Sequence, residues 1–477
     1  MFRKTKIICT LGPATDREGI LEKLIETGMD VARFNFSHGS HEDHRRRYLE
    51  LKKLRNKLKK PVAALLDTRG PEIRVKDFEA GKIMLEPGET FTLTTREIMG
   101  NETEVSITYA GLVKDVAAGD RILLDDGLLE LQVKEVQGTD IVCEVIIGGP
   151  LSNHKGINVP GISLSLPYIS ESDREDLLFG IETGFDFVAA SFVRTAEDVR
   201  EIRELLNANG GGAIQIISKI ENKQGVDNID EILAVSDGIM IARGDMGVEI
   251  PIEDVPSIQK KLIQKCYASG KVAITATQML ESMVQHPRPT RAEATDVANA
   301  IYDGTSAIML SGETAAGKYP VESLATMIRI ALHTEHDIDY VQRFCQHDSC
   351  EKSHSITDAI SHATCSTAHD LNAAAIITVT KSGSTAHMIS KYRPNCPIIG
   401  CSTCVKVCRQ LNLRWGVVPV QTKEEEDTFE LFEHSLDEAV QQGLLKKGDI
   451  AVITAGIPLG MSGTTNLINV HVVGEPY

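Results

Sequence analysis

The chain has 477 residues, which is too long for a single hydrophobic core, so two or three domains are expected. Its formal net charge of −17 excludes broad nucleic-acid binding, because a phosphate backbone needs a basic face and the sequence shows none. No apolar stretch approaches the ~18 residues of a membrane span, and Met1 to Lys4 lead directly into a strand pattern. We therefore expect a cytoplasmic protein without nucleic-acid or membrane partners, in which any anionic ligand binds a local basic pocket.

Eight short apolar segments, rich in β-branched residues, recur through the first two thirds of the chain. They are Lys6 to Leu11, Val31 to Ser37, Val62 to Thr68, Phe185 to Val193, Ala213 to Ile220, Gly238 to Ala242, Val272 to Thr277 and Ala307 to Ser311. Helical patterns separate most of them, as at Asp16 to Thr27, Glu197 to Leu206, Ile258 to Ala268 and Val321 to His333. This alternation predicts an α/β fold in which eight parallel strands close into a (β/α)8 TIM barrel, with reactive residues at its C-terminal rim.

Between the third and fourth strands, long helical patterns give way to short segments in which apolar and polar residues alternate. Glycine turns separate them at Asp125 to Gly127 and at Gln137-Gly138. This pattern predicts an inserted β-barrel domain, with strands at Phe91 to Thr95, Glu104 to Ile107, Arg121 to Leu124, Leu129 to Val133 and Ile141 to Ile147. An insertion after the third strand lies over the rim. We therefore expect a lid that excludes water from a reactive intermediate.

A separate C-terminal α/β domain follows residue 340, with a helix at Ile356 to Leu371 and a strand at Ile376 to Thr380. The Ser/Thr-rich stretch Thr380 to Thr385 then opens another helix, either as a simple cap or as a phosphate-binding loop. The acidic run Glu424 to Asp427 predicts a further helix start. The predicted domains are residues 1–69 and 165–340 for the barrel, 70–164 for the lid and 341–477 for the C-terminal domain.

The fifth predicted strand ends in Lys219 and Glu221, which project to the same face because strand residues two apart do so. The next strand ends in Arg243-Gly244-Asp245, so Glu221 and Asp245 are candidates to share one divalent ion; a pair of salt-bridged strand ends is the alternative. Polar residues end the other strands too, at Arg33, Asn35, Ser37, Asp67, Thr68, Arg69, Ser191, Thr277, Ser311 and Glu313. This enrichment predicts anion and metal chemistry at one end of the barrel. Candidates for the basic pocket are Arg33, Arg69, Arg74, Lys155 and Lys219.

Ten cysteines fit reduced thiols better than disulfides in a cytoplasmic protein. Cys396, Cys401, Cys404 and Cys408 have a spacing that superficially resembles a ferredoxin ligand set. Because Cys401 ends a strand-like run while Cys404 and Cys408 lie four apart on a helical pattern, we do not expect a metal cluster there.

With these motifs in order, the chain closely resembles the pyruvate kinase family. The matching segments follow the family's order along the barrel, and the lid and C-terminal domain match in place and length. They are Thr10 to Ala14, Arg33 to Gly39, Leu66 to Arg74, Ile216 to Asn222, Ile241 to Gly247, Ala276 to Met283, Arg288 to Glu293 and Met309 to Thr314. No residues follow Tyr477, so we expect no copy of the extra C-terminal domain that some members carry.

The resemblance implies transfer of the phosphoryl group of phosphoenolpyruvate to ADP, giving pyruvate and ATP in glycolysis. It implies that Glu221 and Asp245 hold Mg (or Mn), a hard cation that selects oxygen ligands. Lys219 and Arg33 would neutralise the charge of the transferring phosphoryl group. The carboxylate and enolate end of the substrate would be positioned by Gly244, Asp245 and Thr277.

The resemblance also implies a monovalent-cation site, which holds potassium in the family, at Asn35, Ser37, Asp67 and the Thr68 carbonyl. Glu72 supports it, since members with lysine there dispense with the ion. The chain departs from the family at Arg69, where a lysine is common; the charge survives, but the two side chains are not interchangeable at a tight contact.

For the nucleotide, the resemblance implies phosphate contacts from Arg74 and Lys155, and a second Mg arriving with ADP. Asn35 would contribute to this site, and His38 is either near the nucleotide or a structural histidine. Thr277 with an ordered water, linked to Ser311 and Glu313, is the candidate relay that protonates the enolate.

The C-terminal domain contains a segment that resembles the family's loop for a phosphorylated effector. The segment comprises Thr380, Lys381, Ser382, Gly383, Ser384 and Thr385, and Ser462 to Thr465 resembles a second loop near it. Regulation by a sugar phosphate or AMP is expected, and the family is usually homotetrameric. Two rival interpretations are a metal-dependent lyase acting on pyruvate enolate, which needs no nucleotide, and a catalytically silent effector-binding scaffold.

Overall fold

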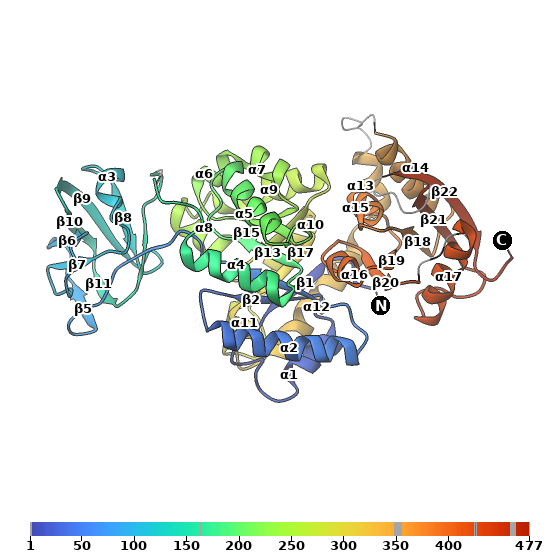
Figure 1. The fold of residues 1–477 in the computed structure, drawn as a ribbon, viewed down its shortest axis with the longest axis horizontal. Coiled ribbons are helices and arrows are strands. Elements are labelled where there is room, and N and C mark those ends of the chain that lie inside the picture. Colours follow the sequence, from blue (N-terminus) through green and yellow to red (C-terminus); the bar gives the residue numbers. More distant parts are fainter. Residues whose placement is uncertain are drawn as a thin grey trace.

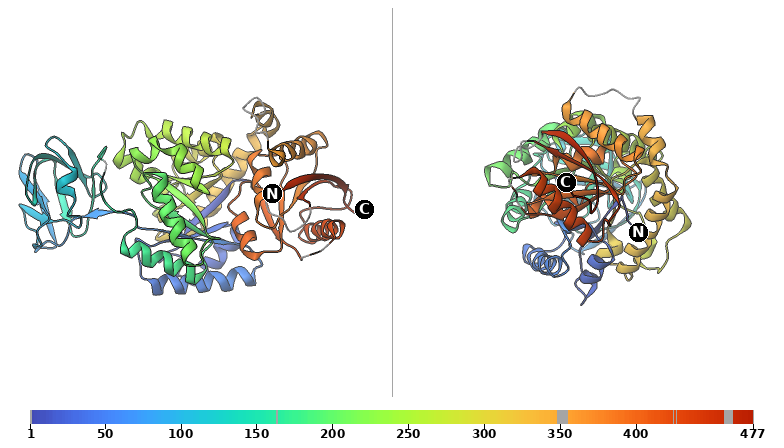
Figure 2. Two further views of the ribbon diagram at one scale, coloured as in Figure 1. Left: turned by 45° about the horizontal axis from the view of Figure 1, so that its top comes forward. Right: turned by 90° about the vertical axis from the view of Figure 1, so that its right-hand side faces the viewer.

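The computed structural model describes residues 2–162, 164–347, 355–423, 425, 427–457 and 464–476. Three bodies lie in a row in Figure 1: the lid at one end, the barrel in the middle and the C-terminal domain at the other end. Figure 2 shows that both chain ends lie on the side of the C-terminal domain. The molecule therefore has two separate interfaces, one at each face of the barrel.

All eight predicted barrel strands are present, and every neighbouring pair is parallel. They close in the order β1-β17-β16-β15-β14-β13-β3-β2. Their side chains are buried almost without exception, because a parallel strand inside a ring of helices has no solvated face. The strands are β1 (Lys6–Thr10), β2 (Val31–Asn35), β3 (Ala63–Asp67), β13 (Phe187–Ala190), β14 (Gln215–Ile220), β15 (Gly238–Ala242), β16 (Val272–Ala276) and β17 (Ala307–Leu310).

Helices surround the barrel strands, as predicted from the alternating pattern. The first helix begins at Ile20 rather than at Asp16, because Gly19 adopts a left-handed φ of 74° that a helix does not continue. The helices are α1 (Ile20–Thr27), α2 (His41–Lys57), α4 (Glu171–Thr183), α5 (Ala196–Ala208), α6 (Lys223–Asp227), α7 (Ile229–Val235), α8 (Arg243–Glu249), α9 (Val255–Ser269), the 3-10 helix η1 (Glu281–Val284), α10 (Arg291–Asp303), α11 (Gly312–Ala315) and α12 (Pro320–Asp337).

The lid consists mainly of one seven-stranded sheet, in the order β4-β12-β8-β9-β10-β6-β7. A bridge between Val75 and Ile107, just beyond the two edge strands, joins the edges, so the sheet curls into the barrel shape that its glycine turns predict. Its elements are β4 (Ile73–Arg74), β5 (Lys82–Leu85), β6 (Thr90–Thr94), β7 (Glu104–Ser106), α3 (Leu112–Asp115), β8 (Arg121–Leu124), β9 (Leu129–Gln137), β10 (Asp140–Ile147), β11 (Gly149–Ser152) and β12 (Gly156–Asn158).

The C-terminal domain is a five-stranded sheet in the order β20-β19-β18-β21-β22, parallel except for its last pair. Glu424 and Glu426 of the acidic run lie outside the described residues, but its last residue, Asp427, caps α17 by accepting the backbone N–H groups of Phe429 and Glu430. The elements are α13 (Tyr340–His347), α14 (Ile356–Asp370), β18 (Ala375–Val379), α15 (Ser384–Lys391), β19 (Ile398–Ser402), α16 (Val405–Leu411), β20 (Val417–Gln421), α17 (Thr428–Gln441), β21 (Ile450–Gly456) and β22 (Thr465–Val472).

The C-terminal domain packs against the N-terminal ends of the barrel strands, which leaves the opposite rim free for the lid. Lys6, at the start of β1, donates to the Val417 carbonyl at 2.6 Å. Asp186, which precedes β13, accepts Arg409 Nε at 2.9 and 3.0 Å, and Arg55 lies 3.9 Å from the same buried carboxylate. This interface therefore contains a buried ion pair between two residues that are 223 positions apart.

A buried histidine behind β2 predicts loss of stability in acid. The His44 ring stacks on Phe36 at 4.2 Å, and burial lowers its pKa to about 4. Because histidine in an unfolded chain has a pKa near 6.5, the unfolded state takes up the proton first as the pH falls. This site should lower the free energy of unfolding by roughly 2–3 kcal/mol between pH 7 and pH 4. Urea unfolding across this range should show a smaller pH slope for His44→Gln, and equal slopes would contradict the prediction.

Candidate active site

A chain of ionic contacts crosses the C-terminal rim of the barrel from β2 through β3 to β14, which is separated from β3 by β13. Arg33 Nε donates to Asp67 Oδ2 at 2.6 Å, and Lys219 Nζ lies 3.0 Å from Asp67 Oδ1. Lys219 Nζ also lies 3.0 Å from Glu221 Oε1, so the two side chains do share a face of β14. Asp67 and Glu221 are fully buried and the two cations nearly so. Two cations thus alternate with two carboxylates across three strands.

Electrostatics within this chain of contacts favour the charged forms of Lys219 and Asp67, but not of Glu221. Burial alone would lower the pKa of Lys219, but the charges of Asp67 and Glu221 outweigh it and raise that pKa. Arg33 and Lys219 overcome the effect of burial on Asp67 and lower its pKa. Burial raises the pKa of Glu221, and the negative charge of Asp245 adds to that shift. A further positive charge beside Glu221 and Asp245 would therefore be stabilised.

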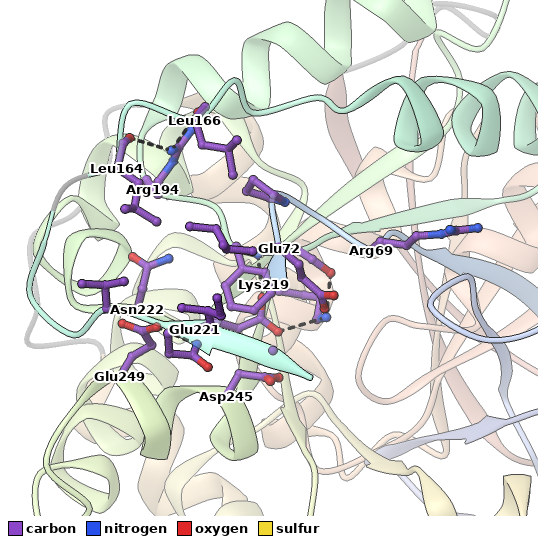
Figure 3. Close-up of a pocket in the computed structure, with 18 of the residues that line it drawn as sticks. Arg69, Glu72, Leu164, Leu166, Arg194, Lys219, Glu221, Asn222, Asp245 and Glu249 are labelled. Carbon is purple, nitrogen blue, oxygen red and sulfur yellow. Dashed lines mark hydrogen bonds and ion pairs between the residues drawn. The ribbon is translucent and has the colours of Figure 1, made fainter. Parts of the chain in front are cut away.

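The two carboxylate oxygens of Glu221 have different partners. The Phe192 backbone N–H donates to Oε2 at 2.6 Å, whereas Oε1 lies 3.0 Å from Lys219 Nζ and accepts no hydrogen bond from the described residues. Figure 3 shows Glu221 and Asp245 in the same cavity, close to Lys219. In the described part of the chain, no three His, Cys, Asp or Glu side chains converge as a complete metal cage. Two carboxylates suit Mg²⁺, which takes its remaining ligands from water and substrate oxygens.

Two residues that follow β13 hold this cluster, and the sequence pattern assigned them no role. Ser191 Oγ accepts from Lys219 Nζ at 2.8 Å and donates to the Thr68 carbonyl at 2.6 Å. Phe192, whose N–H binds Glu221, has a left-handed φ of 53° that is unusual for a non-glycine residue. The sequence indicates Ser191 only as a polar strand end, because side-chain contacts between adjacent strands of the closed barrel have no local sequence signal.

The predicted monovalent-cation residues lie at the ends of β2 and β3. Asn35 and Asp67 are direct partners in the strand register, and Asn35 Oδ1 accepts the Ser37 N–H at 3.1 Å. Asn35 and Ser37 line the central cavity, whereas Asp67 and Thr68 are buried beneath it. This is a cluster of side-chain and carbonyl oxygens, the donor set that a hard cation prefers.

A cavity of about 840 Å³ separates the rim from the lid, and residues of both domains line it. Arg74 donates to the His154 carbonyl at 2.8 Å and pairs with Glu72, while Lys155 pairs with Asp125 at 2.7 Å. His38 lines the cavity as well. The lid therefore contributes two half-exposed cations to a cavity whose floor is Lys219, Glu221 and Asp245.

Arg69 also lines the cavity, but its guanidinium turns away from Lys219. Figure 3 shows the side chain extending from the central cluster, and its Nε lies 3.3 Å from Asp176 Oδ2 on α4. The backbone N–H groups of Arg69 and Gly70 both contact Asp173 Oδ1. This arginine and its turn thus anchor the start of the lid to α4.

Thr277 and its neighbours form a second group beside the cavity, and the cavity lining does not include them. The Gly244 N–H donates to Thr277 Oγ1 at 2.9 Å, and Thr277 has a left-handed φ of 67°. Glu313 accepts backbone N–H groups from Leu280 at 3.0 Å and Ser311 at 2.7 Å, so both of its oxygens brace turns. Ser311 Oγ is buried without a hydrogen-bond partner in the described residues. Among those residues, no hydrogen bond or ion pair joins Ser311 or Glu313 to Thr277.

The Thr380 to Thr385 stretch begins helix α15 in the C-terminal domain, far from the rim. Thr380 Oγ1 accepts the Gly383 N–H at 3.0 Å, and Gly383, with φ 87°, is an N-cap that supplies no side-chain hydrogen bond. Thr385 Oγ1 lies 2.9 Å from Thr465 Oγ1, which brings the second predicted loop beside the first. Ser462 and Gly463 of that loop lie outside the described residues.

In the described part of the chain, the four cysteines from Cys396 to Cys408 do not converge as the ligands of a metal site would. Cys401 is buried in β19, Cys408 is buried in α16, and Cys404 is exposed. All nine described cysteines are free thiols. No described helix is long and apolar enough to cross a membrane.

A closed parallel barrel whose rim gathers cations and carboxylates beneath a lid has the architecture of an enzyme for small anionic substrates. Residues 2–324 match the family model described as "Pyruvate kinase, barrel domain", and residues 358–471 match "Pyruvate kinase, alpha/beta domain". The chain belongs to the pyruvate kinase family, a family of phosphotransferases.

Curated relatives are similar along the whole chain. The pyruvate kinase of Clostridium acetobutylicum is 52% identical over 473 residues, covering 99% of this chain and 100% of the relative. Those of Geobacillus stearothermophilus and Sporosarcina psychrophila are each 53% identical, covering 100% and 99% of this chain and 81% of each relative. The family resemblance inferred from the motifs is therefore confirmed.

Proposed function

We propose that this chain transfers the phosphoryl group of phosphoenolpyruvate to ADP, giving pyruvate and ATP in glycolysis. The observation that supports this most is the contact chain from Arg33 through Asp67 and Lys219 to Glu221. It holds two cations at one place in the cavity, next to a Glu221 oxygen that pairs with Lys219 but accepts no hydrogen bond from the described residues. A silent scaffold has no need to keep such a cluster, and a lyase has no need for Arg74 and Lys155 above it.

Lys219 and Arg33 neutralise the charge on the oxygens of the phosphoryl group as it moves between the enolate oxygen and ADP. Such charge neutralisation is the dominant catalytic contribution in phosphoryl transfer, because the protein forms no covalent bond with the transferred group and acts mainly by positioning and electrostatics. The carboxylates of Glu221 and Asp245 are the proposed ligands of Mg or Mn, which when bound draws substrate oxygens together and offsets their charge. Glu221 is fully buried, whereas Asp245 is partly exposed to the cavity that the substrate would enter.

The residues around Gly244 bind and orient the other end of the substrate. We propose that Gly244 and the Asp245 backbone bind the substrate carboxylate. The Gly244 N–H, which donates to Thr277 Oγ1 at 2.9 Å, would then exchange this partner for a substrate oxygen. After the phosphoryl group leaves, the enolate carbon must gain a proton. We propose that Thr277 and an ordered water deliver this proton. Ser311 and Glu313 would be linked to them as the outer members of the relay.

A potassium ion is proposed at Asn35, Ser37, Asp67 and the Thr68 carbonyl. Ser191 supports this site, because its hydroxyl orients the Thr68 carbonyl while it also accepts from Lys219. Ser191→Ala should therefore raise the potassium concentration needed for half-maximal turnover by roughly tenfold, as loss of an outer-shell partner commonly does.

Potassium titration of the initial rate measures this effect. Ser218→Ala, which removes another buried hydroxyl from the same barrel, is the matched control. A loss of maximal rate with no change in the potassium requirement would contradict the assignment to Ser191.

For the nucleotide, we propose that Arg74 and Lys155 exchange their lid carboxylates for phosphates of ADP, with Asn35 and His38 at the edge of the same site and a second Mg carried by ADP. The Asn158 amide already donates to Glu249 at 2.7 Å, so the lid contacts α8 beside the metal residues.

We propose a cytoplasmic homotetramer with the domain boundaries predicted above. Regulation would come from a sugar phosphate or AMP bound at Thr380, Lys381, Ser382, Gly383, Ser384 and Thr385.

Pyruvate formation from phosphoenolpyruvate and ADP with Mg tests the proposal, with potassium and with sodium as the alternative cation. Turnover that requires potassium would support both the reaction and the monovalent-cation site. No turnover with or without a panel of sugar phosphates and AMP would favour the silent scaffold. Consumption of pyruvate and an aldehyde without nucleotide would favour the lyase.

A further inference from the structure

The peptide group that joins Ser191 to Phe192, called here the 191–192 peptide, lies just beyond β13 and has a hydrogen bond at each end. Its N–H is the group that donates to Glu221 Oε2 at 2.6 Å. Its carbonyl accepts the hydroxyl of Tyr168 at 2.9 Å. No other hydrogen bond to this peptide is present among the described residues. One peptide group therefore connects a tyrosine hydroxyl to a carboxylate of the candidate active site.

The orientation of the 191–192 peptide decides where Glu221 is held. A peptide bond is planar and almost always trans, so its C=O and N–H point in opposite directions and a bond that fixes one end also fixes the other. The backbone itself disfavours this orientation, because Phe192 has a left-handed φ of 53°. Rotation of the peptide would turn the N–H away from Glu221. A partner for the carbonyl therefore stabilises the orientation that the contact with Glu221 requires.

The Tyr168 hydroxyl is buried and keeps its proton. Tyr168 lies on the segment by which the chain returns from the lid, shortly before α4 begins at Glu171. The residue is 6% exposed, and burial raises the pKa of its hydroxyl, so the group donates rather than ionises. A hydrogen bond away from water is electrostatically stronger than one at the surface. The contact with the Ser191 carbonyl is therefore a well-defined constraint on the 191–192 peptide.

Arg194 fixes the segment that carries Tyr168. Its Nη1 donates to the carbonyls of Leu164 and Leu166 at 3.2 and 3.1 Å, as the dashed lines in Figure 3 show. Its guanidinium carbon lies 5.8 Å from the centre of the Tyr168 ring, within the range of a cation–π contact. The same guanidinium pairs with Asp198 at 3.4 Å, at the start of α5. A barrel residue thus holds both the tyrosine ring and the returning segment before it.

We propose that Tyr168 is a positioning residue for the divalent-metal site: its hydroxyl orients the 191–192 peptide, whose N–H in turn holds Glu221 in the position of a metal ligand. The inference rests on the proposed function, in which Glu221 and Asp245 bind Mg or Mn. Tyr168 does not line the central cavity, so it acts only through the peptide. With one carboxylate oxygen already fixed, cation binding orders less of the side chain and is therefore tighter.

Titration of the full chain with Mn²⁺, in which electron paramagnetic resonance follows the free ion, tests this proposal without turnover. Tyr168→Phe keeps the ring and removes only the hydroxyl. Its affinity for Mn²⁺ should fall by about tenfold, the lower end of the usual effect of losing an outer-shell partner. The Mg concentration for half-maximal pyruvate formation should rise by a similar factor. In contrast, kcat at saturating Mg should change by less than about threefold, because the hydroxyl contacts no reacting group.

Tyr48→Phe is the matched control. Tyr48 is also buried, and its hydroxyl also donates to a backbone carbonyl, that of Gly184, at 2.9 Å. Gly184 ends α4 shortly before β13 begins, at the face of the barrel opposite the rim, so Mn²⁺ affinity should not change. A thermal melt should show a similar loss of stability in both variants, because each loses one buried hydrogen bond. Only Tyr168→Phe should combine this loss with weaker metal binding.

Glu221→Gln separates a failure of this proposal from a failure of the proposed function. If Mn²⁺ affinity falls in Glu221→Gln but stays at the wild-type value in Tyr168→Phe, the role of Tyr168 is overturned and the metal assignment stands. An equal loss in Tyr48→Phe also overturns that role, because the effect is then a general one. Unchanged Mn²⁺ affinity in Glu221→Gln overturns both, since the 191–192 peptide would then hold a residue that is not a metal ligand.

Discussion

Lys219→Met is expected to lower the turnover of phosphoenolpyruvate and ADP by at least about 10²–10³-fold, the usual effect of removing one donor that stabilises transition-state charge. Methionine keeps much of the length of the side chain but removes the charge that links Asp67 to Glu221. The loss should fall on kcat more than on KM, because the lysine acts on charge that develops during transfer. Steady-state kinetics of pyruvate formation with Mg and potassium measures it.

The control for this variant is Lys265→Met, which removes a lysine on the outer helix α9 that pairs with Asp230. It should change turnover by less than twofold, since surface ion pairs contribute about 0–1 kcal/mol. Retention of more than a tenth of wild-type kcat in Lys219→Met would contradict the role of Lys219. A folded variant, shown by an intact circular dichroism spectrum, is required for the comparison.

Arg409→Met is expected to lower the free energy of unfolding by about 3–5 kcal/mol at pH 7, the usual cost of removing one partner of a buried ion pair. Asp186 is fully buried and accepts Arg409 Nε at 2.9 and 3.0 Å, so the variant leaves its carboxylate with Arg55 at 3.9 Å and the Ala64 N–H at 3.0 Å. Urea unfolding followed by circular dichroism measures the change. Arg200→Met on exposed α5 should cost less than about 0.5 kcal/mol.

The pH dependence distinguishes an unpaired charge from a packing defect. Burial already raises the pKa of Asp186 above its usual value, although Arg409 opposes the shift. In Arg409→Met that pKa rises further, so the folded state holds the proton more tightly than the unfolded state. Stability is then lost as the pH rises through the folded pKa, and the deficit of the variant should shrink as the pH falls toward 4. A deficit that does not change with pH would indicate lost packing alone.

Local pattern predicts the barrel and its eight strands, although some predicted strands overrun, as Phe185 to Val193 does the observed Phe187–Ala190. Apolar runs such as Gly238 to Ala242 are short, β-branched and bounded by turn residues, and a parallel strand buried on both faces requires that composition. The shared face of Lys219 and Glu221 followed from the two-residue period of a strand. The start of α1 was predicted four residues early, because the left-handed Gly19 interrupts a helical pattern.

The sequence by itself determined the eight-strand alternation, the position of the lid and the residue types at the rim, because these depend on local periodicity and turn chemistry. Only the tertiary structure decided which rim residues meet: the contact of Ser191 with Lys219 and Thr68, the buried Asp186–Arg409 pair, and the bond from Tyr168 to the Ser191 carbonyl. Each of these depends on barrel closure and domain docking, which bring together side chains tens to hundreds of residues apart. Long-range contacts of this kind leave no periodic signal in the chain, because the geometry that forms them belongs to the closed sheet rather than to any one segment.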